Sequence, residues 1–267
     1  MISGIHDKTG RQLLIHADDL GMCKSINSAI VDAFKANAIS AASIMAPCPA
    51  ADEAIRLCID HPEWDVGIHL TLTSEWEALR WGPLSPPSAV SSLIDEDGYF
   101  WKDVPLFMAH ARLMEIRTEI DTQLSYIHDF GLRPTHMDCH MYSLFCSGAL
   151  FRVYSETAEE WKIPALGRKS ASSPGKIFSL NRSSQIHHFT DLYVRMISKD
   201  WQGVAQLTTH PGYDTLELKS MIGATGPWGA EWRQADLAAI SSAYFREFML
   251  EAGIQRVGWR IAPSLSE

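Results

Sequence analysis

Residues 12–36 have the sequence QLLIHADDLGMCKSINSAIVDAFKA. The first six residues form a short and almost continuous apolar run, which is typical of a strand that is buried on both faces. Residues 25–36 follow with a helical pattern whose apolar side chains share one face: Ile26, Ile30 and Phe34. Asp18 and Asp19 lie between the two segments. A buried strand followed by a helix predicts the repeating unit of an α/β protein.

The same alternation continues along the chain. Further apolar runs predict strands over 41–46, 65–72, 134–138, 163–166, 203–209 and 254–259. Helical patterns predict helices over 50–60, 105–130, 147–161, 189–199 and 235–252. Strands alternating with helices require parallel pairing through right-handed crossovers, and the count of about seven strands favours an irregular, incomplete (β/α) barrel. An open doubly wound sheet is the alternative, although neither GxGxxG nor GxxxxGK[ST] occurs.

We expect the whole chain, residues 1–267, to form a single domain. Residues 1–10 are expected to fray at the N-terminus. Three long irregular segments are predicted to be loops at the rim of the barrel: 73–103, 168–187 and 211–233. Loops of this length are uncommon in compact domains unless they serve a function.

The composition excludes several classes of protein. The 32 acidic residues outnumber the 23 Lys and Arg, which leaves a net charge of −9 and no basic run to bind nucleic acid. The five cysteines include no CxxC pair, which favours a reducing compartment. Neither a secretory leader nor a membrane-spanning run of about 18 apolar residues is recognisable. We therefore expect a cytoplasmic protein whose partners are neither nucleic acids nor membranes.

The ionisable residues that follow the predicted strands are the strongest functional signal. They are Asp18, Asp19, His69, His136, Asp138, His140, Arg168 and His210. In a parallel barrel the carboxyl ends of all strands meet at one rim, where active sites lie. The sequence therefore predicts that these side chains converge, although they are far apart along the chain.

Histidine and aspartate together suit a divalent metal ion. Two histidines and one carboxylate can hold Zn²⁺ and leave a position open for water, and the same set suits non-haem iron. In an extended chain the alternate residues of segment 136–140 share one face. Asp18 and Asp19 would point to opposite sides, so that one binds a metal while the other faces the substrate. Taken singly, each motif also fits a turn, an exposed polar edge or a hydrogen-bonded core residue.

Tryptophans are frequent in the predicted rim loops. The candidates for contact with a substrate are Trp76, Trp81, Trp228 and Trp232. Their flat apolar rings suit the apolar faces of sugars, but packing of the loops against the barrel explains them equally well. Glu75, Glu77 and Glu231 in these loops are candidates for binding hydroxyl or amine groups.

Four short motifs resemble those of the YdjC-like (ChbG/HpnK) carbohydrate deacetylases. Residues 16–21, HADDLG, are similar to the family's NADDFG, and residues 67–70, GIHL, are similar to its GxHL. Residues 135–140, THMDCH, resemble its THxDSH, and residues 210–212, HPG, contain its late His-Pro. The motifs occur in the family's order.

The resemblance implies an irregular (β/α) barrel related to polysaccharide deacetylases. It also implies metal-dependent hydrolysis of the N-acetyl group of an acetylated amino sugar or short oligosaccharide, with release of acetate. Asp19, His69 and His140 would bind one divalent ion, with zinc and magnesium as the candidates. Asp18 would be the general base and His210 the acid.

Three further residues would support the site. By resemblance His136 and Asp138 orient the metal ligands. We also expect Arg168 to steady Asp18, although no matched motif supports this.

The chain departs from the family pattern in two places, and both leave the substrate open. His16 stands where the family has Asn, and residues 141–144, MYSL, which include Tyr142, stand where the family often has further histidines. The sequence does not identify the sugar or the metal, and it does not decide between a monomer and a homodimer.

Other functions are compatible with parts of the pattern. A non-haem iron oxygenase would use His136, Asp138 and His210 as its ligands, but such enzymes are usually all-β. A metal-dependent phosphoesterase lacks support from any phosphate-binding motif. A sugar-binding barrel without catalysis would leave Asp18 and Asp19 without a role.

Overall fold

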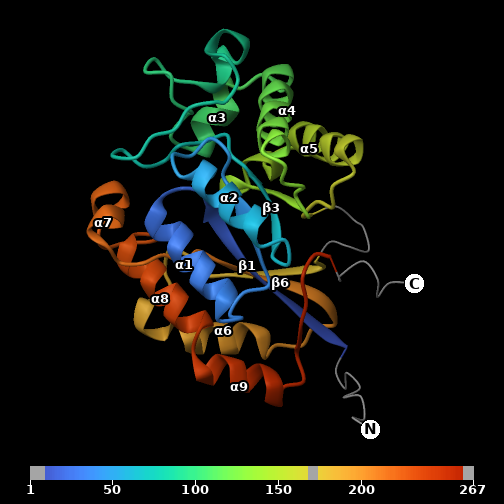
Figure 1. Cartoon of the computed structure of the whole chain (residues 1–267), viewed down its shortest axis with the longest axis vertical. Coiled ribbons are helices and arrows are strands. Elements are labelled where there is room, and N and C mark those ends of the chain that lie inside the picture. The colour runs from blue at the N-terminus through green and yellow to red at the C-terminus, as the bar shows by residue number, and fades with distance from the viewer. Residues whose placement is uncertain (1–9, 168–173, 261–267) are drawn as a thin grey trace.

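The fold is a curled parallel sheet surrounded by helices. The computed structural model describes residues 10–167 and 174–260 (Figure 1). Every strand pairing in this part of the chain is parallel, and the strands follow the order β4-β3-β2-β1-β6-β5, with β7 added at the start of β1. Within the described residues no strand pairing joins β4 to β5. The predicted incomplete (β/α) barrel is confirmed, and the open doubly wound alternative is wrong.

The strands have the following bounds: β1 Arg11–Leu20, β2 Ala41–Ile44, β3 Asp65–Leu70, β4 Met137–Cys139, β5 Lys176–Ser179, β6 Gly203–Thr209 and β7 Gln255–Arg256. The α-helices are α1 Lys24–Lys35, α2 Ala51–Asp60, α3 Val104–His110, α4 Leu113–Asp129, α5 Gly148–Trp161, α6 Phe189–Ile197, α7 Leu216–Ile222, α8 Ala230–Ile240 and α9 Ala243–Glu251. Four short 3₁₀ helices are η1 Pro87–Ala89, η2 Ser91–Leu93, η3 His140–Phe145 and η4 Ile186–His188.

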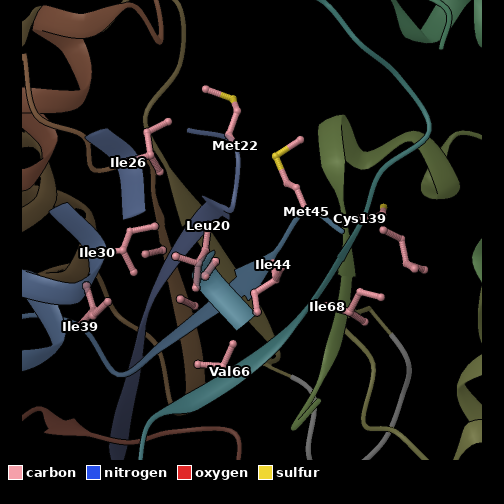
Figure 2. Packing of buried hydrophobic residues seen from close by; sticks show 14 of the residues in the cluster. Leu20, Met22, Ile26, Ile30, Ile39, Ile44, Met45, Val66, Ile68 and Cys139 are labelled. Atoms are coloured by element: carbon pink, nitrogen blue, oxygen red, sulfur yellow. The ribbon is translucent and has the colours of Figure 1, made fainter. Parts of the chain in front are cut away.

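The core forms where apolar side chains of the strands meet the apolar faces of the helices. Nine of the ten residues of β1 are buried, as its apolar run predicts for a strand covered on both faces. Figure 2 shows Ile26 and Ile30 of α1 beside Leu20 of β1 in the main hydrophobic cluster. In Figure 1, α3, α4 and α5 gather at one end of the molecule, and α6, α8 and α9 lie at the other.

Several predicted boundaries are wrong. Within the predicted strand 163–166 only Ala165 pairs, through an isolated bridge to Met137. The fifth strand is instead β5, which lies inside the segment predicted to be irregular. The strand has four residues, of which only Ile177 and Phe178 are apolar, so it shows no recognisable strand pattern. The predicted strand 254–259 is reduced to the two residues of β7.

Two predicted helices are each divided into two. Segment 105–130 breaks at Ala111 and Arg112, where the backbone is extended and the Arg112 N–H donates to the Ser92 hydroxyl instead of continuing the helix. Segment 235–252 breaks before Ser242, whose hydroxyl accepts from the Phe245 N–H and caps α9. The predicted loop 211–233 contains α7 and the start of α8.

Two further observations concern the cysteines and the helices. The five cysteines are all free thiols, and Cys146 is the exposed one. Among the described helices none is both long enough and apolar enough to cross a bilayer.

Candidate metal centre

A bulge at the end of β1 positions the two adjacent carboxylates. The pairing of β1 with β2 shifts register between Ala17 and Leu20, and Asp19 has a left-handed backbone with φ of 69°. Both carboxylates therefore approach the same imidazole nitrogen: His69 Nε2 lies 3.6 Å from Asp19 Oδ1 and 4.0 Å from Asp18 Oδ2. The prediction that the two aspartates point to opposite sides is wrong, because the chain is not regularly extended here.

Three side chains from separate elements present ligand atoms to one point. Asp19 from β1, His69 from β3 and His140 from η3 each offer an atom, and these atoms lie within 4.8 Å of one another. The Asp19 Oδ1 atom is 3.4 Å from His140 Nδ1. All three residues are buried, with exposures of 1%, 2% and 5%. The three form the group that the family resemblance implies for a metal.

His69 is held by its second ring nitrogen. The Asp138 Oδ1 atom lies 2.8 Å from His69 Nδ1, so the Nδ1–H donates to the carboxylate and Nε2 keeps its lone pair for a metal. The Ser43 hydroxyl donates to Asp138 Oδ2 over 3.1 Å. Burial opposes ionisation of Asp138, but the neighbouring His69 lowers the pKa of Asp138. The hydrogen bond to the Asp138 carboxylate therefore fixes the orientation of His69.

The other two ligand residues are anchored in the same way. His140 Nε2 lies 2.9 Å from Glu75 Oε2, which leaves His140 Nδ1 directed at Asp19. Arg233 Nη2 donates to Asp19 Oδ2 over 2.7 Å, which leaves Asp19 Oδ1 free. Arg233 from α8 is itself only 1% exposed. Each of the three ligand residues thus has one side-chain atom held by a hydrogen bond and a second atom that can bind a metal.

The free atoms fit a divalent cation. Asp19 Oδ1 is buried and has no hydrogen-bond partner, although two imidazole nitrogens face it. An unpaired buried carboxylate oxygen is costly, and a cation at this point would satisfy it. Burial opposes the charged form of His140, but Glu75 and Asp19 raise the pKa of His140 to about 10. Metal binding at neutral pH would therefore release a proton from His140.

Asp18 and His210 lie beside the three ligand atoms. Asp18 Oδ1 is 2.7 Å from His16 Nδ1, and Asp18 Oδ2 is 3.8 Å from His210 Nε2. The backbone N–H of His210 donates to Asp236 Oδ2 over 2.7 Å, which fixes the start of the loop after β6. Burial lowers the pKa of His210. The two residues predicted to handle protons therefore face each other across the site.

A cavity of about 810 Å³ opens over this cluster. The predicted contacts Trp76 and Trp228 line it. Trp81 and Trp232 do not, because both are 2% exposed and pack inside the protein: Trp81 lies edge-on to His140 and Trp232 lies against Phe189. Trp81 and Trp232 therefore pack the loops against the barrel and do not face the cavity. Arg168 lies outside the described residues, so its predicted role is untested.

Comparison with known proteins identifies the family of this chain. The model of a family described as YdjC-like protein matches residues 12–251. The chain belongs to the YdjC-like family. Among curated relatives, a carbohydrate deacetylase of Geobacillus stearothermophilus is 29% identical to this YdjC-like chain over 255 residues, which cover 94% of this chain and 97% of the relative. A carbohydrate deacetylase of Thermoanaerobacter pseudethanolicus is 28% identical over 217 residues, covering 78% and 84%.

Solved structures support the YdjC-like fold. A crystal structure of a protein from Enterococcus faecalis V583 superposes with a TM-score of 0.81 at 23% identity, covering 94% of this chain and 98% of that one. A structure described as T48 deacetylase with substrate gives a TM-score of 0.51 at 11% identity, covering 99% and 96%. At these identities the structures support the fold alone.

The site of this YdjC-like chain also contains residues whose roles the sequence did not indicate. No sequence pattern around Arg233 indicates a site residue, and Arg233 lies 214 residues along the chain from its partner Asp19. Glu75, a candidate for substrate contact, lines the cavity and also holds His140. The iron-oxygenase alternative is not supported, because the described residues contain no ligand group that joins His210 to His136 and Asp138.

Proposed function

We propose that the protein is a metal-dependent hydrolase that removes the N-acetyl group from an acetylated amino sugar or a short oligosaccharide. The observation that carries the proposal is the convergence of Asp19 Oδ1, His69 Nε2 and His140 Nδ1 beside the Asp18 carboxylate. Family membership and the names of the curated relatives support deacetylation of a carbohydrate. The proposal adds that the bond cleaved is the linear amide C–N bond of an N-acetyl group.

Asp19, His69 and His140 would hold one divalent ion, with zinc and magnesium as candidates. When bound, such an ion lowers the pKa of a coordinated water and polarises a carbonyl oxygen. Asp138, Glu75 and Arg233 keep the three ligands in place through the contacts described above. The residues of this chain therefore supply a rigid and buried ligand set.

Asp18 is the proposed general base. Its Oδ1 atom is tied to His16, whereas its Oδ2 atom faces His69 and His210 at the floor of the cavity. Oδ2 is thus the atom placed to accept a proton from a water that attacks the acetyl carbon. A positioned base of this kind contributes about 10²–10⁴-fold to the rate.

His210 is the proposed acid for the leaving amine. Its ring lies on the side of Asp18 that faces the cavity, and burial, by lowering the pKa of His210, makes its protonated form a stronger donor. Trp76 and Trp228 line the cavity and offer apolar ring faces to a sugar. The cavity volume is within the usual range for a site that holds a small ligand, about 300–1,000 Å³.

Acetate release tests this function directly. The protein is assayed with N-acetylglucosamine, its short oligomers and other N-acetylated sugars, with and without a chelator. We expect acetate from at least one sugar, and we expect the chelator to abolish its release. Saturable sugar binding without acetate release would instead favour a binding module, and turnover that survives exhaustive chelation would contradict metal dependence.

Replacing the proposed base separates catalysis from metal binding. Asp18→Asn should retain the metal, because the three ligands are unchanged, while kcat falls by about 10²–10⁴-fold. Acetate release and elemental analysis are measured on the same preparation. Turnover at the parent rate would show that Asp18 is not the base.

A further inference from the structure

A line of polar contacts runs from Asp18 into the interior of the barrel. Asp18 Oδ1 lies 2.7 Å from His16 Nδ1, and His16 Nε2 lies 2.7 Å from His136 Nε2. His136 Nδ1 lies 2.9 Å from the Thr135 hydroxyl, which donates to Asp65 Oδ1. The line therefore joins the carboxyl end of β1 to Asp65, the first residue of β3 at the opposite end of the sheet.

Two arrangements of protons satisfy every contact in this line. In both, His16 donates from Nδ1 to Asp18, His136 donates from Nδ1 to Thr135, and Thr135 donates to Asp65; they differ in whether His16 or His136 donates between the two Nε2 atoms. The directions of the pKa shifts favour donation by His16. Burial opposes the charged form of His16, but its hydrogen bond to Asp18 and the Asp138 charge raise its pKa, whereas burial lowers the pKa of His136.

Tight packing holds the two imidazoles in place. Both His16 and His136 are fully buried at 0% exposure. The indole of Trp259 stacks on His136 with ring centroids 4.8 Å apart and planes inclined by 7°. Gly67 leaves the space that His136 fills, because a Cβ at this position would lie 2.6 Å from His136 Nε2. Neither ring can rotate without displacing its neighbours.

The distance between the rings favours a hydrogen bond over a shared metal. His16, His136 and Asp138 have the composition of a ligand group. Two imidazole nitrogens bound to one tetrahedral zinc ion at about 2.05 Å would be about 3.3 Å apart. The observed 2.7 Å between the Nε2 atoms is too short for that arrangement and fits an N–H···N contact.

We infer that His16 is a positioning residue for Asp18, and that His136, Thr135 and Asp65 hold His16 in place. By binding Oδ1 of Asp18, His16 leaves Oδ2 as the oxygen directed at the cavity. The inference rests on the proposed function, in which Asp18 is the base. It gives a role to His16, one of the two departures from the family pattern.

Two substitutions at position 16 separate the donated hydrogen bond from the volume of the ring. Asparagine places an amide N–H where His16 has Nδ1–H, so it can still donate to Asp18, whereas alanine cannot. We expect His16→Ala to lower kcat by about 10–100-fold with unchanged KM and metal content, because a base displaced by about 1 Å costs up to 10²-fold. His16→Asn should recover kcat to within about threefold of the parent value, since the donor to Asp18 is restored. His128→Ala, on the exposed face of α4, is the control for histidine loss.

Several outcomes would overturn the inference. Equal kcat values for His16→Ala and His16→Asn, whether lower than the parent value or not, would show that the hydrogen bond donated to Asp18 is not the function of His16. Loss of metal from His16→Ala would make His16 part of the metal site. Two metal equivalents in the parent and one in His16→Ala would show a second metal between the imidazoles.

A spectroscopic measurement keeps the inference testable without turnover. In protein labelled with ¹⁵N-histidine, His16 should show a protonated Nδ1 whose proton resonates downfield and moves upfield in Asp18→Asn, because an amide oxygen is a weaker acceptor than a carboxylate. An unprotonated Nδ1 would contradict the inference. If the parent releases no acetate from any sugar, the proposed function fails, while this spectrum still decides the contact between His16 and Asp18.

Discussion

Gly67 is a residue whose smallness the site requires. A Cβ here would lie 2.5 Å from the carbonyl oxygen of His136 and 2.6 Å from its Nε2. The backbone of β3 is hydrogen-bonded to this segment on both sides of Gly67: the Ile68 N–H donates to the same carbonyl over 3.0 Å, and the Val66 carbonyl accepts from the Thr135 N–H over 2.9 Å. Space beside His136, and not backbone freedom, is therefore the reason for glycine at position 67.

We predict that Gly67→Ala destabilises the protein by about 1–3 kcal/mol, the usual cost of overpacking a close-packed core. Denaturant unfolding measures the change. Gly148→Ala is the matched control, because a Cβ at Gly148 meets nothing within 4 Å. A Gly67→Ala protein as stable as Gly148→Ala would mean that β3 and β4 separate more easily than the structure indicates.

At the residue scale, the sequence predicted the members of the site better than their contacts. Asp18, Asp19, His69, His140 and His210 lie together because each stands at the carboxyl end of a parallel strand or directly after it, which the alternation of elements predicts. Arg233 could not be predicted, because its contact with Asp19 depends on how α8 packs, and no local pattern encodes that packing.

The element that orders the first rim loop is α4. Glu119 of α4 is fully buried and accepts from the backbone N–H groups of Leu84 and Ser85 over 3.0 and 2.9 Å. Gln123, one turn later, accepts from the Thr71 N–H and donates to the Thr71 carbonyl. Through these contacts α4 fixes both the beginning of the loop and a point within it, and the loop carries Glu75 to His140.

Replacing Glu119 should loosen this loop before it unfolds the barrel. Glu119→Gln keeps one acceptor oxygen but turns an N–H group toward a backbone donor, so we expect a loss of about 1–3 kcal/mol. Hydrogen exchange should accelerate at the amides of Leu84 and Ser85. Glu160→Gln is the control, because that side chain is 59% exposed in its ion pair with Arg117. Unchanged exchange at both amides would contradict the role of Glu119.

At the element scale, long and strongly patterned segments were predictable and short ones were not. The apolar residues of α4 recur at spacings of three and four, which is typical of one buried helix face. Ile116, Ile120, Leu124 and Ile127 are buried, whereas the first residue of this series, Leu113, is 43% exposed at the helix start. The break before α4 escaped prediction because a loop residue, Ser92, takes the N–H of Arg112. The strand β5 escaped because four residues are too few to show a pattern.

At the scale of the whole molecule, the site connects distant parts of the chain. Its ligands and their partners come from β1, β3, β4, the loop after β3, η3 and α8. A cation that binds this group in the folded chain but not in the unfolded one stabilises the fold by mass action. We therefore expect the proposed metal binding to stabilise the whole fold.

We predict that metal at 100 times its Kd stabilises the protein by about 2.7 kcal/mol and raises Tm by roughly 5–10 °C. Asp19→Asn should abolish this shift. Asparagine tolerates the left-handed backbone of position 19. Loss of the metal-induced Tm shift would therefore come from the missing carboxylate charge and not from backbone strain. Thermal unfolding is followed with and without Zn²⁺ or Mg²⁺. An equal shift in Asp19→Asn would place the stabilising ion elsewhere.

The single accessible thiol offers a way to observe the candidate metal centre. Burial raises the pKa of the other four thiols, to about 12 for Cys58, so a maleimide reagent near neutral pH would modify Cys146 selectively. Cys146 directly follows η3, the segment that begins with His140, and its Sγ–H donates to the Tyr142 carbonyl over 3.5 Å. A fluorophore attached there would sense rearrangement of that segment when an ion or a sugar binds, without any engineered cysteine.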